Sequence, residues 1–170
     1  MQLMPDTPLR RAALEIESHV AAEGWDQPPR VFALVHTAEL AAREPALADQ
    51  LPDDPDGITP VEQDGIPADR SLEDVLTDIS WPDAVTGCAA VIERIMLPPE
   101  AEDALPDDPD ELAAAAAAHP DRREVRLVAA VTRDGQAHSA VRARDPHDAE
   151  LLEGPDLVPG LIEHLRRTLA

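Results

Sequence analysis

Three arginines and one histidine occur at alternate positions of a predicted β-hairpin that spans residues 124–144. Runs rich in Val, Leu and Ala flank Asp134-Gly135, a dipeptide typical of tight turns between antiparallel strands. In this hairpin one face would carry the side chains of Arg126, Arg142, Arg144 and His138, together with those of Glu124, Val128, Ala130 and Ala140. Guanidinium groups suit carboxylate or phosphate, so this basic face is a candidate site for an anionic ligand.

The length of the hairpin loop decides which side chains share that face. A two-residue loop would place Leu127 opposite Arg142 and so mix guanidinium groups with apolar side chains. A three-residue loop, Arg133–Gly135, places Gly135 at a left-handed position and pairs Leu127 with Val141, which leaves the other face apolar. Because a shift of one residue turns every side chain to the opposite face, burial of the apolar face favours the three-residue loop.

Arg126 would then lie opposite Arg142, and facing guanidinium groups repel each other unless an acidic group lies nearby. Two alternatives remain open. Either an acidic loop of the same chain neutralises the arginines, or an anionic ligand or an acidic partner protein does so. Residues 49–83 hold eleven acidic residues and one arginine, and residues 100–111 hold seven acidic residues and no basic one. Residues 122–144 hold six arginines and two acids, so the composition favours the internal partner.

The composition restricts the classes of function. The chain has 170 residues and a formal net charge of −21, with 18 prolines, one cysteine and neither lysine nor asparagine. Such an acidic surface repels nucleic acids and anionic membranes, so we predict binding to neither. The single Cys88 excludes an internal disulfide. The sequence shows no signal peptide and no apolar run of membrane-spanning length, so we expect a cytoplasmic protein.

Motifs for other kinds of chemistry are absent from the sequence. It contains no phosphate-binding loop, dinucleotide-binding glycine pattern, nucleophile elbow or zinc-protease helix. Cys88 lies in an apolar run, which favours a small core residue over a nucleophile. The hexapeptide Leu-Pro-Asp-Asp-Pro-Asp occurs at 51–56 and 105–110, but it lacks the glycine and distal glutamate of a calcium loop and is typical of a solvated linker. We therefore predict no catalytic residue, no metal site and no cofactor.

The elements that position the hairpin follow from hydrophobic periodicity and helix-capping residues. Helices are expected at residues 8–23, 38–44, 72–79, 109–118 and 157–169, with Thr7, Thr37, Ser71, Asp108 and Asp156 as N-caps. Further strands are expected at 31–36, 58–63 and 86–97. The run 86–97 is apolar on both faces, which indicates a central strand covered on both sides.

These elements predict an α+β fold. We expect a small, largely antiparallel sheet of three to five strands, including the hairpin 124–144, packed by N- and C-terminal helices. A chain of this length forms one domain, here residues 1–170, with acidic proline-rich loops at about 49–70 and 98–110.

Five blocks of the sequence resemble an uncharacterised family of conserved actinobacterial proteins: VFALVHTAEL, TPVEQ, WPDAVTGCAAVIERIMLPPEAE, HPDRREVRLVAAVTRDG and GPDLVPGLIEHL. The resemblance covers nearly the whole chain. It implies a high-GC actinobacterial source, a cytosolic protein and no established activity, so it supplies no catalytic residue. In architecture, terminal helices around a small antiparallel sheet also resemble chaperone-type α+β domains related to type III secretion chaperones, although the helices between the strands depart from that pattern.

Together these observations favour a non-enzymatic protein that binds another protein, as an adaptor or chaperone-like module. A homodimer through a sheet edge or a terminal helix is one form of such binding, since two-fold dimers are the commonest oligomers. The alternative is a small-molecule binder or enzyme in which Arg126, Arg142, Arg144 and His138 hold an anionic ligand. Arginines already paired with Asp or Glu would favour the first interpretation, and a deep pocket beside them would favour the second.

Overall fold

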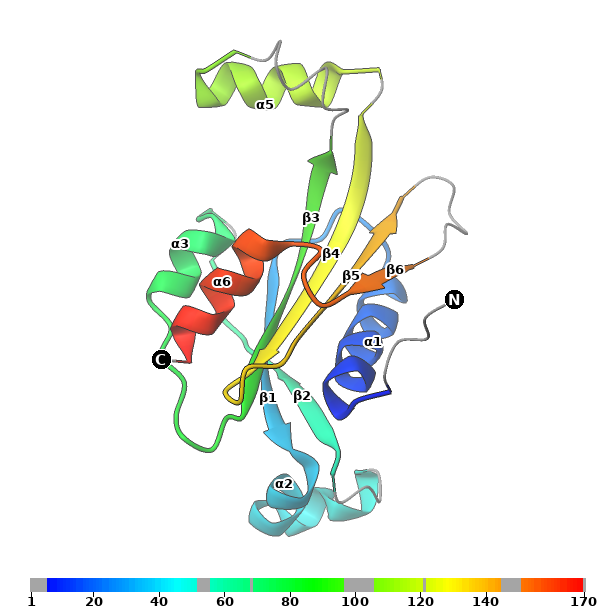
Figure 1. The fold of residues 1–170 in the computed structure, drawn as a ribbon, viewed down its shortest axis with the longest axis vertical. Coiled ribbons are helices and arrows are strands. Elements are labelled where there is room, and N and C mark those ends of the chain that lie inside the picture. Colours follow the sequence, from blue (N-terminus) through cyan, green and yellow to red (C-terminus); the bar gives the residue numbers. More distant parts are fainter. Residues whose placement is uncertain are drawn as a thin grey trace.

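An antiparallel sheet is the central element of the fold (Figure 1). The computed structural model describes residues 6–51, 56–67, 69–96, 106–120, 122–144 and 151–169. Over these ranges the strands are β1 (Arg30–His36), β2 (Ile58–Glu62), β3 (Gly87–Met96), β4 (Arg123–Thr132), β5 (Ala137–Ala143) and β6 (Leu152–Gly154). They form one six-stranded sheet in the order β2-β1-β3-β4-β5-β6, and every neighbouring pair is antiparallel.

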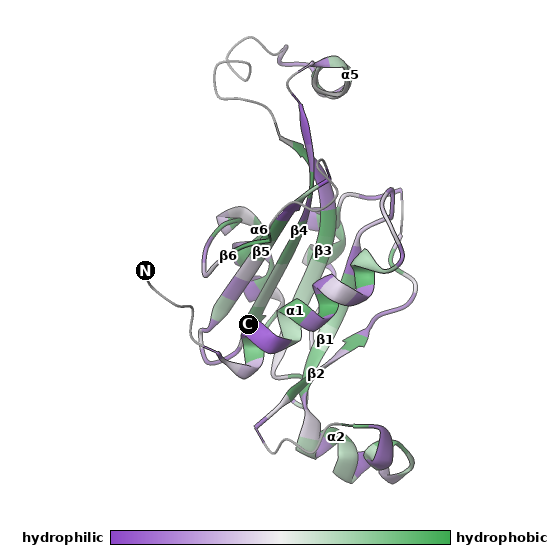
Figure 2. Ribbon diagram, turned by 90° about the vertical axis from the view of Figure 1, so that its right-hand side faces the viewer, coloured by the Kyte–Doolittle hydropathy of each residue, from purple (hydrophilic) through white to green (hydrophobic). Residues whose placement is uncertain are grey.

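Helices cover both faces of this sheet. α1 (Pro8–Ala21) lies on one face, and α3 (Leu72–Thr77) and α6 (Pro159–Thr168) lie side by side on the other (Figure 1). α2 (Thr37–Arg43) and the 3-10 helix η1 (Pro45–Gln50) lie beyond one end of the strands, and α5 (Pro109–Ala118) lies beyond the other end, as Figure 2 also shows. The prediction of an α+β fold with an antiparallel sheet is therefore confirmed.

The hairpin of β4 and β5 has the three-residue loop that the sequence predicts. Leu127 pairs with Val141, and the backbone N–H of Thr132 donates to the carbonyl of Gln136 at 3.0 Å. Gly135 has a φ of +95°, in the left-handed region that glycine adopts at low cost. Burial of one apolar face thus fixes the register, as expected.

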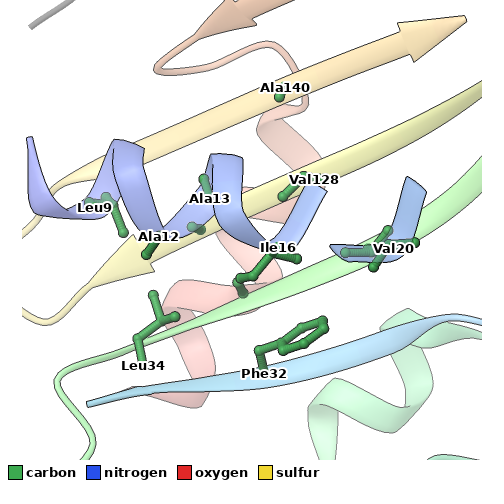
Figure 3. Close-up of a cluster of buried hydrophobic side chains, with 12 residues drawn as sticks. Leu9, Ala12, Ala13, Ile16, Val20, Phe32, Leu34, Val128 and Ala140 are labelled. Carbon is green, nitrogen blue, oxygen red and sulfur yellow. The ribbon is translucent and has the colours of Figure 1, made fainter. Parts of the chain in front are cut away.

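Two hydrophobic cores hold the helices against the sheet. On the α1 side, Figure 3 shows the labelled members of the core: Leu9, Ala12, Ala13, Ile16, Val20, Phe32, Leu34, Val128 and Ala140. On the α6 side the buried members are Val31, Leu72, Leu76, Cys88, Ala90, Ala129, Val131, Leu161, Ile162, Leu165 and Leu169. Full burial of a Val, Leu or Ile side chain stabilises the fold by roughly 1.5–3 kcal/mol. β3 contributes to both cores, so the prediction of a central strand covered on both faces is confirmed.

Side-chain caps set the start of most helices. Three predicted N-caps accept a hydrogen bond from the backbone N–H three residues later: Thr7, Ser71 and Asp108. The other two predicted caps are wrong. Thr37 is the first residue of α2, and its hydroxyl bonds to that of Thr59 at 2.7 Å. α6 begins at Pro159, which favours the first turn of a helix, and Val158 rather than Asp156 is the N-cap residue.

The sheet has one strand more than the largest number predicted. The additional strand, β6, is three residues long, which is too short to show an alternating pattern in the sequence. The expected acidic loops are described in part, because residues 52–55, 68 and 97–105 lie outside the described residues. Inside the first of these segments, β2 forms the strand that the sequence predicts, and it lies at one edge of the sheet.

Candidate functional site

The structure brings the four predicted site residues to one face of the sheet, but α1 covers that face. The candidate anion-binding face is therefore not a solvent-exposed surface, because the side chain of Arg126 is 1% exposed and His138 is 5% exposed. Arg142 and Arg144 are half-buried beside them. The four side chains therefore belong to the contact between α1 and the sheet.

Glu17 of α1 neutralises the two facing arginines. Its carboxylate accepts hydrogen bonds from Arg142 Nε at 2.6 Å and Nη2 at 3.2 Å, and it lies 3.9 Å from Nη1 of Arg126. Glu17 is 4% exposed, and its hydrogen bonds raise the pKa of Arg142. The sequence held a usable indication, since Glu17 follows Ala13 by four residues and precedes Val20 by three, on the buried stripe of α1.

The loop after α1 closes over Arg126. Gly24, with a φ of +89°, lies three residues after the end of α1, and its carbonyl accepts a hydrogen bond from Nη2 of Arg126 at 2.6 Å. The ring of Trp25 lies with its centroid 4.3 Å from the guanidinium carbon of Arg126 and 5.7 Å from that of Arg144. Such cation–π contacts contribute about 2 kcal/mol when the cation is desolvated. Burial nevertheless lowers the pKa of Arg126 from its ordinary value.

Two further carboxylates fix this loop. Asp26 accepts hydrogen bonds from Arg144 Nη1 at 2.8 Å and Nη2 at 3.0 Å, and the contact lowers the pKa of Asp26. Glu93 of β3 accepts hydrogen bonds from the backbone N–H groups of Asp26 at 2.9 Å and Gln27 at 3.0 Å. These bonds hold Asp26 at a φ of +66°, a region that non-glycine residues rarely adopt.

His138 belongs to a separate cluster at the β6 edge. Its Nε2 lies 3.0 Å from Oε1 of Glu153, and the same carboxylate accepts hydrogen bonds from Arg10 Nε at 2.9 Å and Nη2 at 3.1 Å. Arg10, and to a smaller extent His138, lowers the pKa of Glu153. This cluster ties the short strand β6 to β5 and to the first turn of α1.

All four predicted site residues thus have partners within the chain. The expectation of an internal acidic partner is confirmed, but its location is not. The acids come from α1, the loop after it, β3, β4 and β6, and not from the described parts of the two acidic segments. This arrangement suits a structural role more than the capture of a free anion.

Other candidate chemistry in the described part of the chain is limited. No group of three or more His, Cys, Asp or Glu residues among the described ranges is placed to hold a metal ion. The acidic hexapeptide at 51–56 lies mostly outside these ranges, and so does the first residue of the copy at 105–110. Cys88 is fully buried, as predicted, with Sγ 3.4 Å from Oγ1 of Thr168. Burial raises the pKa of this thiol to about 11, which makes it a poor nucleophile.

A groove on the opposite face is a feature that the sequence did not predict. It has a volume of about 370 Å³ and lies where α6 begins, over the sheet. Its lining is Glu73, Arg94, Leu127, Leu157, Val158, Pro159, Gly160, Leu161 and His164. Two leucines of this face are strongly exposed for apolar residues: Leu157 of the lining at 43%, and Leu152, which pairs with Val141 on the same face of the sheet, at 61%. α3 and α6 cover only part of this face, since β3 and β4 continue past them towards α5 (Figure 1).

The groove is built on fixed elements. The buried hydroxyl of Ser139 donates to the carbonyl of Gly154 at 2.8 Å and accepts from the backbone N–H of Leu157 at 2.9 Å. The loop that carries Leu157 is therefore held against β5. On the other wall, Arg94 of β3 is ion-paired with Glu73 of α3. The apolar lining is consequently held in place by contacts within the chain.

Comparison with known proteins places the chain in a family. A family model described as PPA1309-like protein matches residues 9–170, which include all described strands and nearly all described helical residues. No curated protein and no solved structure matches the chain. Across the described ranges, no helix combines the length and apolar character needed to cross a membrane. The match spans nearly the whole chain, and the protein therefore belongs to the uncharacterised PPA1309-like protein family.

Proposed function

We propose that this protein is a non-enzymatic, cytoplasmic protein-binding module of adaptor or chaperone-like type, which acts as a single domain in an actinobacterial cell. The observation that supports the proposal most is the apolar groove beside α6, with exposed Leu152 and Leu157 at its margin. Contiguous exposed apolar surface of this kind, bordered by polar side chains, is typical of a site for another protein.

The arginine face gives less support to an anion-binding function. Each of its arginines already donates to a carboxylate or a backbone carbonyl of the chain, and α1 with Trp25 separates Arg126 from solvent. A ligand there would have to displace Glu17 or Asp26, and thus break contacts that hold α1 to the sheet. Ligand binding at the arginine face would therefore also destabilise the fold.

Neither edge of the sheet favours pairing with another strand. The backbone N–H of Gln63 donates to the carbonyl of Val31, so the backbone N–H and C=O groups of alternate residues of β2 bond to β1. The backbone groups of the other residues, Ile58, Pro60 and Glu62, point away from the sheet. Pro60 has no N–H, which removes the central donor of this edge. The other edge, β6, is only three residues long. A partner is therefore more easily accommodated in the groove than at an edge.

A capture experiment with matched variants tests the proposal. Wild-type protein, the double variant Leu152→Ser/Leu157→Ser and the control Leu47→Ser are immobilised and exposed to lysate of the source organism. Leu47 is 39% exposed but lies on η1, away from the groove. We expect a protein that the wild type and Leu47→Ser retain in a fixed stoichiometry and the groove variant does not. If all three retain the same proteins, or none, the groove is not a protein-binding site.

A further inference from the structure

We propose that the groove receives a basic amphipathic helix of a different protein, with its apolar stripe on the sheet and its Lys or Arg side chains towards the acidic surface of the chain. This inference rests on the proposed function, because it names the partner for the same groove. It is argued from the strand register, the shape of the helical layer and the distribution of charge.

The strand register creates an apolar row across four strands. Ile92 of β3 pairs with Leu127 of β4, Leu127 pairs with Val141 of β5, and Val141 pairs with Leu152 of β6. Paired residues share a face of the sheet, so the four side chains lie side by side on the α6 face. From Leu127 outward exposure rises, from 8% for Leu127 to 61% for Leu152. The row therefore runs out from under the helical layer into solvent.

The shape of this surface fits a helix. α6 packs Leu161, Ile162 and Leu165 on the neighbouring part of the same face, so the row continues a surface that already accepts a helix. At the start of α6, a methyl group on Gly160 would meet no atom within 4 Å, which leaves room for another element to approach. A second helix at that point would extend the α3–α6 layer along β3 and β4.

The charge around the groove selects a basic occupant. Arg94 is the arginine of the lining, and its guanidinium is already paired with Glu73. Asp156, directly before Leu157, and Glu163, one turn after Gly160, are exposed on the segment that lines the groove, and Glu163 is ion-paired with Arg167 at 3.4 Å. The local acids Glu73 and Glu163 are paired with arginines, but the whole chain has a formal net charge of −21, so Lys or Arg side chains on the occupant would be attracted at long range.

The same charge argues against a second copy of the chain in this groove. Two copies would approach with −21 each, and the Debye length of about 8 Å at physiological salt does not screen groups in contact. Like-charged surfaces brought together cost binding free energy, which favours a partner of opposite sign. The occupant that the observations favour is thus a basic helix from another protein.

Three synthetic peptides test the inference by isothermal titration calorimetry with the full chain. The first has a leucine stripe at helical spacing and lysines on the polar face, the second has the same stripe with glutamates, and the third keeps the lysines but has serines in the stripe. We expect the leucine–lysine peptide to bind at least tenfold more tightly than either of the others. We expect Leu152→Ser/Leu157→Ser to weaken it at least tenfold and Leu47→Ser to leave it unchanged.

The other outcomes separate the partner class from the proposed function. If the leucine–glutamate peptide binds as tightly as the leucine–lysine peptide, and the groove variant weakens both, the basic partner is wrong while a protein-binding groove stands. If the leucine–lysine and serine–lysine peptides bind equally and the groove variant has no effect, binding is only electrostatic and the inference is overturned. If light scattering shows a dimer that the groove variant abolishes, the second copy is the occupant and the inference is likewise overturned.

Discussion

Removal of the Glu17 carboxylate is expected to destabilise the fold by about 3 kcal/mol. The carboxylate is 4% exposed, lies between Arg126 and Arg142, and accepts two hydrogen bonds from the latter. Loss of one partner from a buried ion pair costs roughly 3–5 kcal/mol, because a charge is left uncompensated. The Arg142 side chain is 28% exposed, so water can solvate part of it and the lower end applies. For a chain of this size, the corresponding fall in Tm is about 6–12 °C.

Glu17→Ala is measured against Glu15→Ala by thermal and urea unfolding, followed by circular dichroism. Glu15 is exposed on the same helix, so both variants share the change in helix propensity, and Glu15→Ala should alter stability by no more than about 0.5 kcal/mol. A double-mutant cycle with Arg142→Ala isolates the pair. Equal effects of Glu17→Ala and Glu15→Ala, or strict additivity in the cycle, would refute the reasoning.

Three further predictions concern backbone space, thiol burial and pH. A methyl group on Gly87 would collide with a backbone carbonyl of the facing strand, so Gly87→Ala should lower the free energy of unfolding in urea by about 1–3 kcal/mol. In the control Gly160→Ala the methyl group meets open space, so this variant should be neutral or stabilising by up to about 1 kcal/mol. At pH 8, Cys88, with its pKa raised to about 11 by burial, should react with a thiol reagent only after unfolding; reaction of the native protein at the rate of a free thiol would contradict its burial. Arg144 lowers the pKa of Asp26, so their pair stabilises the fold above the ordinary aspartate pKa of about 3.9, and the contribution is lost as the pH falls through the lowered value. Asp26→Asn should therefore flatten the acid limb of a stability–pH curve; an unchanged limb would show that the pair does not contribute.

The sequence was most informative where one local pattern decided the outcome. The three-residue loop followed from Leu127 and Val141, because the competing register would have placed Arg142 opposite Leu127 on the apolar face. β3 was predictable as central from its apolar residues on both faces. By contrast, β6 is held through its contacts with β5, and three residues give no periodicity of their own.

The site depended on tertiary contacts and was predicted less well. The excess of acidic residues predicts that an acid of the chain neutralises the arginine face. Which acid does so depends on how α1 crosses the sheet. Glu17 was recognisable only as a carboxylate on an apolar stripe. The groove was not predictable, because Leu127 and Leu152 are 25 residues apart in sequence. Only the register of β4, β5 and β6 brings them into one row, with Val141 between them.

The two tryptophans lie on opposite sides of the sheet, which gives the protein a pair of independent optical reporters. Trp25 stacks on Arg126 beside α1, and the indole N–H of Trp81 donates to Oγ1 of Thr168 on α6 at 2.9 Å. The chain has no tyrosine, so emission from each indole is free of that background. In a Trp25→Phe variant, intrinsic fluorescence would follow the α6 layer alone, and in a Trp81→Phe variant the α1 layer alone. Comparison of the two would show whether one helical layer detaches before the other.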